Sequence, residues 1–202
     1  MLITVTGIDG SGKSTLIGGL AEALTAAGRE VVVVRPMHHD AQLLRMLAKT
    51  RRLAPDDSGW AGRVEGFIGL HTCWVMAAKV CDAVLPALDR GAVVIADRWV
   101  ADHVTSQGWF GVTLDPAAEP LDRLPVPDLE IFVDVPVAVA QRRVEARDPD
   151  GSVGSGTEFL GYFREHLINW YGGRPHLRLD GTEAPRTVLA NALPVVKGAT
   201  GP

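Results

Sequence analysis

The chain is poor in cysteine, with Cys73 and Cys81 as the two among 202 residues. Both fall in one helical pattern, where eight residues span about 12 Å, beyond the reach of a disulfide. Two cysteines without a clustered histidine partner also argue against a zinc site. We therefore expect reduced packing residues, as in a cytoplasmic protein.

The sequence also lacks a surplus of positive charge, since its formal net charge is −4. The molecule as a whole should attract neither nucleic acid nor an anionic membrane. We expect no membrane-spanning run, and no secretory signal, because MLITVTGIDG has no basic lead and no apolar core. Any phosphate binding must then come from a local site.

The composition, with 47% hydrophobic and 22% charged residues, is that of an ordinary globular protein. The length suits one domain, 1–202. Apolar runs predict strands at 2–6, 31–34, 92–96, 129–135 and 176–180. Helical patterns cover 14–27, 41–52, 63–89, 137–147, 157–171 and 183–196, with a bend expected near Pro86. Strands apolar on both faces and alternating with helices predict an α/β fold of three layers, a parallel sheet of about five strands between helices.

One motif follows the first predicted strand. Residues 7–14 read Gly-Ile-Asp-Gly-Ser-Gly-Lys-Ser and match G-x-x-x-x-G-K-[ST] without a mismatch. Backbone N–H groups of such a loop and the following helix N-terminus bind phosphate, Lys13 would reach the β- and γ-phosphates, and Ser14 would bind Mg²⁺. The alternative, a glycine-rich turn with a chance Lys and Ser, fits this strand–helix context poorly. The predicted ATP-binding residues are Gly7, Asp9, Gly10, Ser11, Gly12, Lys13, Ser14 and Thr15.

A second charged turn, Asp97-Arg98-Trp99, follows the strand predicted at 92–96. Ligands gather at the carboxyl ends of parallel strands, so this turn should lie beside the phosphate-binding loop. Asp97 is a candidate to hold Mg²⁺ through water, and Arg98 could bind a transferring phosphoryl group with both guanidinium nitrogens. The alternative is an exposed ion pair at a strand end.

Arg143 and Arg147 lie four residues apart on the helix predicted at 137–147 and share a face. The next residues, 148–156, form a flexible loop by composition. A mobile loop beside a basic face could close over the γ-phosphate as a lid at about 142–157. A solvated helix face with Glu145 and Asp148 as partners is the alternative.

Together these residues resemble the thymidylate kinase family of P-loop nucleoside monophosphate kinases, in order over nearly the whole chain. Residues 7–15 are similar to the family's P-loop, Asp97-Arg98 to its Asp-Arg-Tyr/His turn, 127–135 to the strand before its lid helix, and 179–182 to the segment near adenine. The resemblance implies the P-loop NTPase fold and ATP- and Mg²⁺-dependent phosphoryl transfer to a nucleoside monophosphate-like acceptor.

Site roles follow from the resemblance residue by residue. Asp9 would touch the acceptor sugar or the metal, and Arg35 and Arg98 the acceptor phosphate. Arg143 and Arg147 would serve the transferring group, because in the family branch with glycine at the Gly10 position the lid arginines complete the phosphate site. The residues expected to carry the reaction are Lys13, Asp9, Arg98, Arg143 and Arg147.

The acceptor base pocket departs from the family pattern. The family's long helix offers a phenylalanine that stacks on thymine and an arginine four residues later, and an ungapped count from Asp97 gives Thr72 and Met76 there. Asp102 and the pair Ser106-Gln107 fall where the family often has a serine and then Tyr-Gln. These changes predict an altered base specificity with an intact donor side. The expected acceptor-binding residues are Asp9, Arg35, Thr72, Met76, Arg98, Asp102 and Gln107.

Two other functions stay open from the sequence. The first is a kinase of an unphosphorylated nucleoside or another small metabolite, in which Asp9 would act as a base toward a hydroxyl. The second is a non-catalytic nucleotide-binding regulatory protein. The family commonly dimerises through its long helices, and the apolar stretch 68–85 is compatible with a homodimer or with burial inside the monomer.

Overall fold

The computed structural model describes residues 1–37, 58–109, 111–147 and 156–200, and for 58–65 and 200 the backbone alone. Five strands form one sheet in the order β2-β3-β1-β4-β5, with every pairing parallel. The strands are β1 (Leu2–Thr6), β2 (Val31–Val34), β3 (Val93–Asp97), β4 (Leu129–Asp134) and β5 (Leu177–Asp180). The predicted five-stranded parallel sheet is confirmed.

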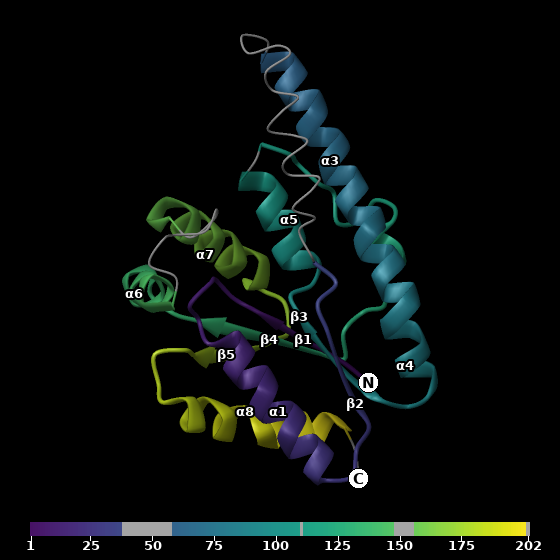
Figure 1. The fold of residues 1–202 in the computed structure, drawn as a ribbon, viewed down its shortest axis with the longest axis vertical. Coiled ribbons are helices and arrows are strands. Elements are labelled where there is room, and N and C mark those ends of the chain that lie inside the picture. Colours follow the sequence, from purple (N-terminus) through teal and green to yellow (C-terminus); the bar gives the residue numbers. More distant parts are fainter. Residues whose placement is uncertain (38–57, 110, 148–155, 201–202) are drawn as a thin grey trace.

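Helices cover both faces of this sheet (Figure 1). On one face lie α1 (Lys13–Ala26) and α8 (Pro185–Thr200), which pack on Ile3, Val5 and Ile95. The opposite face carries the long helical segment together with α5, α7 and α6, with α7 between the other two (Figure 1). These elements are α3 (Ser58–Lys79), η2 (Val80–Val84), α4 (Leu85–Asp89), α5 (Val100–Trp109), α6 (Val137–Arg147) and α7 (Thr157–Tyr171).

The alternation of side chains along β1 explains the three layers. Ile3 and Val5 point to the α1 and α8 side, whereas Leu2 points to α3 and α4. Val5 pairs with Asp97 of β3, and Thr6 pairs with Phe132 of β4. The loops that leave β1 and β3 therefore emerge side by side at one edge of the sheet.

The prediction that residues 31–34 are covered on both faces is wrong. β2 is an edge strand, and the side chain of Val33 is 47% exposed. A run of four valines indicates strand structure but does not distinguish an edge strand from a central one.

The predicted long helix is continuous but irregular. A π-helical turn at Val80–Val84 separates α3 from α4 and ends just before Pro86, which cannot donate to the carbonyl four residues earlier. Cys73 is buried in this segment as expected, but Cys81 is exposed and is not a packing residue.

The stretch Gly66–Asp89 is long and apolar enough to cross a membrane, by length and composition alone, so the expectation of no such run is wrong. Its inner side nevertheless packs in the protein core, through Met76, Val80, Val84 and Ala87. The segment thus covers the sheet with its inner side, while 33% of its apolar window is buried and its outer side is exposed.

The sequence patterns did not predict α5, and some of the elements that they did predict lie outside the described residues. No helix was expected at 100–109, where Asp102, His103, Thr105, Ser106 and Gln107 are buried polar residues. The stretch 112–127, for which no strand or helix was predicted, contains one short 3-10 turn, η3 (Leu121–Arg123), and buries Leu121. The helix predicted at 41–52 and the loop at 148–155 lie outside the described residues.

Candidate functional site

The glycine-rich loop connects the buried strand β1 to helix α1. Gly12 caps α1 with φ +100 and ψ +8, a left-handed conformation that favours glycine. The Ser11 N–H donates to the Ile8 carbonyl at 3.1 Å, and Lys13 Nζ donates to the same oxygen at 2.9 Å. The loop thus curls around the Lys13 ammonium group, beside the start of α1, where the first N–H groups of a helix have no intrahelical partners.

Gly10 lies where the loop touches helix α6. Its φ is +80, and a Cβ atom there would come within 2.4 Å of the Ala140 carbonyl oxygen. The absence of a side chain at this position lets α6 approach the phosphate-binding loop.

A cavity of about 530 Å³ opens above the loop. Five basic side chains and two carboxylates line it, so it carries a net positive charge that suits a polyanion. Its lining residues are Asp9, Gly10, Gly12, Lys13, Ser14, Thr15, Arg35, Met37, Asp97, Arg98, Arg143 and Arg147. The structure therefore brings together the second charged turn, the α6 arginines and most of the predicted loop residues. The exceptions are Gly7, which does not line the cavity, and Ser11, which lines a second cavity described below.

Two ionisable groups of the loop are shifted by this environment. Burial and the neighbouring charge of Arg98 lower the pKa of Lys13 to about 8. Burial alone would raise the pKa of Asp9, but the positive charges of Arg98, Lys13 and Arg147 prevail and hold it below its usual value. Asp9 is therefore a stable carboxylate and a weak base at neutral pH.

Asp97 ends β3 at the back of the cavity. Its Oδ2 pairs with Arg35 Nε at 3.0 Å, while its buried Oδ1 has no hydrogen-bond partner among the described residues. Ser14 lines the same cavity. A hydroxyl and a carboxylate oxygen beside a phosphate site are the donors that Mg²⁺ prefers, together with water and phosphate oxygens. Within the described residues no group of three metal-ligating side chains occurs, so such an ion would need those other ligands.

Arg98 adopts a left-handed backbone conformation, with φ +74. Its Nη1 donates to Asp102 at 2.8 Å and to the Gly7 carbonyl at 3.3 Å, and its Nη2 donates to Asp9. The guanidinium carbon lies 5.4 Å from the centre of the Phe163 ring. Arg98 thereby links the turn after β3 to the loop after β1.

The expectation that Asp102 contacts the acceptor directly does not fit its position. Asp102 is fully buried beneath Arg98 and is not among the residues that line the cavity. Arg35, by contrast, is two-thirds exposed and does line it.

The two arginines of α6 reach the site in different ways. Arg143 Nη1 donates to the carbonyls of Gly10 at 3.2 Å and Gly181 at 2.8 Å, so it bridges the phosphate-binding loop and the segment after β5. Arg147 lines the cavity and contributes to the low pKa of Asp9.

A second cavity of about 200 Å³ lies beyond Arg143. Apolar side chains of Leu16, Val133 and Val188 line it beside Gly181 and Glu183. The segment 179–182, which the resemblance places near adenine, therefore contributes Gly181 to a cavity whose apolar walls suit a flat base.

The residues expected around the acceptor base gather between α3 and α5. Thr72, Met76 and Gln107 line a small cavity of about 10 Å³ with Pro36, Met37, Val75 and His103, and Met37 also lines the main cavity. His103 Nε2 lies 3.4 Å from Thr72 Oγ1 and 3.2 Å from Cys73 Sγ. Sequence reasoning missed His103, although it stands one helical turn before Gln107 and so shares its face of α5.

Comparison with known proteins agrees with this geometry. The family model described as thymidylate kinase matches residues 5–188. A thymidylate kinase of Xylella fastidiosa is 33% identical over 199 residues, which cover 97% of this chain and 90% of that protein. A thymidylate kinase of Geobacter sulfurreducens is 32% identical, with 95% of both chains covered. The sequence resemblance is thus confirmed, and the chain belongs to the thymidylate kinase family.

Proposed function

We infer that this chain is an ATP-dependent nucleoside monophosphate kinase, which transfers the γ-phosphoryl group of ATP to the phosphate of a nucleoside monophosphate. The observation that carries this inference is the basic cavity shared by the phosphate-binding loop, Asp97, Arg98 and α6. Such chemistry needs positioning and charge neutralisation rather than a covalent intermediate, and these side chains are suited to both.

On the donor side, the backbone of residues 10–15 and the Lys13 ammonium group would hold the β- and γ-phosphates. Ser14 and the unpaired Oδ1 of Asp97 would hold Mg²⁺, directly or through water, and the ion would neutralise phosphate charge when bound. The cavity lined by Gly181 and Glu183 would take the adenine.

On the acceptor side, Arg98 and Arg35 would bind the acceptor phosphate, and Arg147 would stabilise the phosphoryl group during its transfer. A phosphate oxygen of the acceptor attacks the γ-phosphorus while the bond to the β–γ bridging oxygen breaks, and ADP leaves. A lid at 142–157 would exclude water during this step.

The acceptor base specificity is proposed to differ from that for thymine. No arginine occurs from Leu70 to Val80, and the hydrogen-bonding side chains between α3 and α5 are Thr72, His103 and Gln107. The space between them is about 10 Å³, enough for one water molecule, so a base would have to open it or lie at its rim beside Met37. A pocket with different donors and acceptors discriminates against a base that needs the original ones.

The first alternative, phosphorylation of a nucleoside hydroxyl, requires Asp9 to accept a proton. Its ion pair with Arg98 and its lowered pKa make it a poor base, so this alternative is disfavoured. The second alternative, a non-catalytic nucleotide-binding protein, is disfavoured because Lys13, Ser14, Asp97 and Arg147 are all in the cavity.

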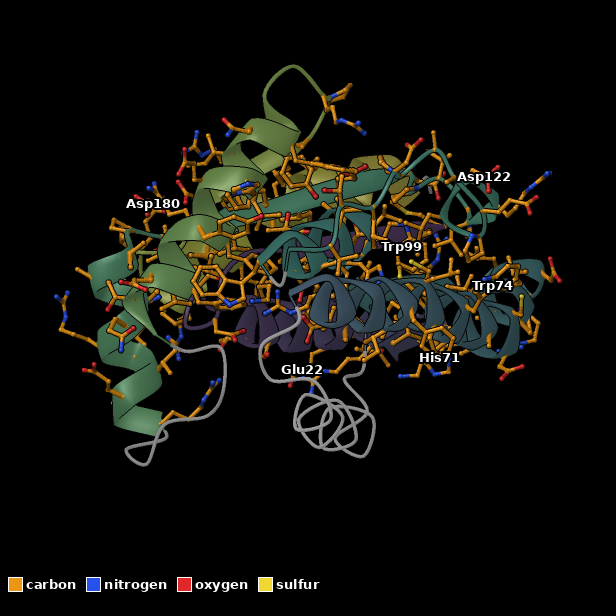
Figure 2. The ribbon with its side chains drawn as sticks, turned by 90° about the horizontal axis from the view of Figure 1, so that it is seen from above. Glu22, His71, Trp74, Trp99, Asp122 and Asp180 are labelled. Atoms are coloured by element: carbon orange, nitrogen blue, oxygen red, sulfur yellow. The ribbon has the colours of Figure 1, made fainter. Side chains whose placement is uncertain are left out.

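We also propose a homodimer formed through α3. Exposed apolar side chains follow one another on the outer side of the long segment at spacings of three or four residues, at Phe67, Leu70, Trp74, Ala78, Cys81 and Leu85. Figure 2 shows His71 at the outer margin of α3, whereas the buried Trp99 lies between α3 and the rest of the molecule. The side chains of Phe67, Leu70 and Trp74 are 68%, 50% and 55% exposed. The same stripe on a second copy of the chain is the surface that would best cover them, because a two-fold axis brings identical patches together. Sedimentation of a monomer at micromolar concentration would contradict the dimer.

A coupled ADP-release screen tests the proposed activity. The protein is incubated with ATP, Mg²⁺ and, one at a time, natural and modified nucleoside monophosphates and the matching nucleosides. Release stimulated by a monophosphate supports the proposal, whereas release stimulated by nucleosides alone supports the first alternative. No stimulated release with any acceptor supports the second.

A further inference from the structure

We propose that Asp102 is a positioning residue for Arg98: it fixes one edge of the guanidinium group and leaves the other edge to exchange Asp9 for the acceptor phosphate. This inference rests on the proposed function, because it assigns Arg98 to that phosphate. It gives Asp102 a role without substrate contact, in keeping with its full burial.

Asp102 is held by donors on every side. It accepts from Arg98 Nη1 at 2.8 Å, from the Trp99 N–H at 3.3 Å and from the Thr6 hydroxyl. The Thr6 hydroxyl itself accepts from Tyr171 at 3.1 Å, so its single proton is available for Asp102. Burial raises the pKa of Asp102, and the neighbouring charge of Arg98 opposes that rise. A fully buried carboxyl group with three donors has little freedom to exchange its partners.

The same carboxylate also stabilises the turn that presents Arg98. Trp99 precedes the first residue of α5, and Asp102 is the third residue of that helix, so its contact with the Trp99 N–H caps the helix start. The turn needs this support because Arg98 has φ +74, which is unfavourable for a residue with a side chain. Asp102 thus fixes both the backbone and the guanidinium of Arg98.

The two edges of the Arg98 guanidinium differ in their surroundings. Nη1 is enclosed by Asp102 and the Gly7 carbonyl, whereas Nη2 binds Asp9, whose side chain is 41% exposed and lines the cavity. An incoming phosphate can therefore displace Asp9 from Nη2 but cannot reach Nη1. Asp102 keeps the arginine in place while its outer partner changes.

The test variant is Asp102→Asn, which keeps the shape but offers one acceptor oxygen to three donors. With each monophosphate that the wild-type enzyme turns over, we expect kcat/KM to fall by about 10- to 100-fold, the cost of a misplaced binding group. Asp102 reaches the ATP-binding residues only through its charge, which raises the pKa of Lys13. The KM for ATP should therefore stay within about twofold when it is measured at about pH 6.5, where Lys13 keeps its proton. A kcat/KM for the acceptor equal to that of wild type overturns the proposal.

A double-mutant cycle separates positioning from a general structural effect. In an Arg98→Ala background, Asp102→Asn should change kcat/KM for the acceptor by less than about twofold, since the residue it positions is gone. The same loss in both backgrounds would show that Asp102 acts without Arg98 and would overturn the proposal.

Thr6→Val provides a second variant if Asp102→Asn folds poorly, because it removes one donor to Asp102 and leaves the carboxylate and Arg98 in place. We expect a smaller loss in the same parameter, again with an unchanged KM for ATP, and equality with wild type would count against the proposal. If the wild-type enzyme turns over no monophosphate, the proposed function fails and this inference fails with it. If the wild-type enzyme turns over a monophosphate, and both Asp102→Asn and Thr6→Val have the wild-type kcat/KM for that acceptor, this inference fails and the proposed function stands.

Discussion

Replacement of Gly10 by alanine should separate the phosphate-binding loop from α6. Gly10 has φ +80, and an added Cβ would lie 2.4 Å from the Ala140 carbonyl oxygen, a backbone atom that a side-chain rotation cannot move. Gly28 offers a matched control, because its φ is +81 and an added Cβ would meet nothing within 4 Å. Both substitutions impose the same backbone strain, and the first adds the collision.

The expected magnitudes follow from these two terms. The left-handed conformation costs a residue with a side chain about 1–2 kcal/mol, so Gly28→Ala should lose that much stability. Gly10→Ala should lose about 1–3 kcal/mol more, because excess volume in a packed contact costs that amount. For a domain of this size, each kcal/mol corresponds to about 2–4 °C in Tm.

Thermal and urea unfolding measure the stability difference, and the ADP-release assay measures its effect on turnover. Since α6 carries Arg143 and Arg147, Gly10→Ala should also lower kcat, whereas Gly28→Ala should leave it unchanged. Equal stability and equal kcat for the two variants would refute the inferred contact between the loop and α6.

Three further outcomes are expected. Lys13→Ala should abolish turnover, because it removes the one ammonium group held inside the loop, and unchanged ADP release would contradict that role. Arg147→Ala should lower kcat more than it weakens ATP binding, as comparison of kcat with a titrated Kd will show. Because burial lowers the pKa of Lys13 to about 8, that side chain loses its proton in the free protein above this pH. ATP binding must then take up a proton, so its Kd should rise up to about tenfold per pH unit above 8 in the wild type, and calorimetry that finds no such rise would contradict this shift.

The sheet and most helices could be predicted because their residues repeat with a clear period. The strands at 2–6 and 31–34 and the helices at 137–147 and 157–171 agree with the structure to the residue. The parallel arrangement followed from strands that alternate with helices, but the strand order did not, because local patterns carry no information on which strands pair.

Helix α5 shows why part of the site escaped prediction. Apart from Ala101, its buried residues are polar, so the hydrophobic period that marks a helix is absent; they are Asp102, His103, Thr105, Ser106 and Gln107. Asp102 is buried there with Arg98, four residues earlier in the chain, whereas His103 lies against Thr72 and Cys73, which are distant in sequence. Local propensity and burial disagree at functional sites, where polar groups find partners only in the folded chain.

The P-loop and the charged turn could be predicted because the residues of each are consecutive in the sequence. Their joint geometry, in which Arg98 binds Asp9 and Asp102 at once, depends on the pairing of β1 with β3. The bridge from Arg143 to Gly10 and Gly181 depends likewise on three separate segments.

A crystal structure with a non-hydrolysable ATP analogue, Mg²⁺ and the best acceptor from the screen tests the central claim most directly. We expect the triphosphate within the curl of residues 10–15, with Lys13 Nζ moved from the Ile8 carbonyl to the β- and γ-phosphates and the acceptor phosphate on Arg98. A triphosphate bound elsewhere, with Lys13 still on Ile8, would contradict the assignment of this cavity to phosphoryl transfer.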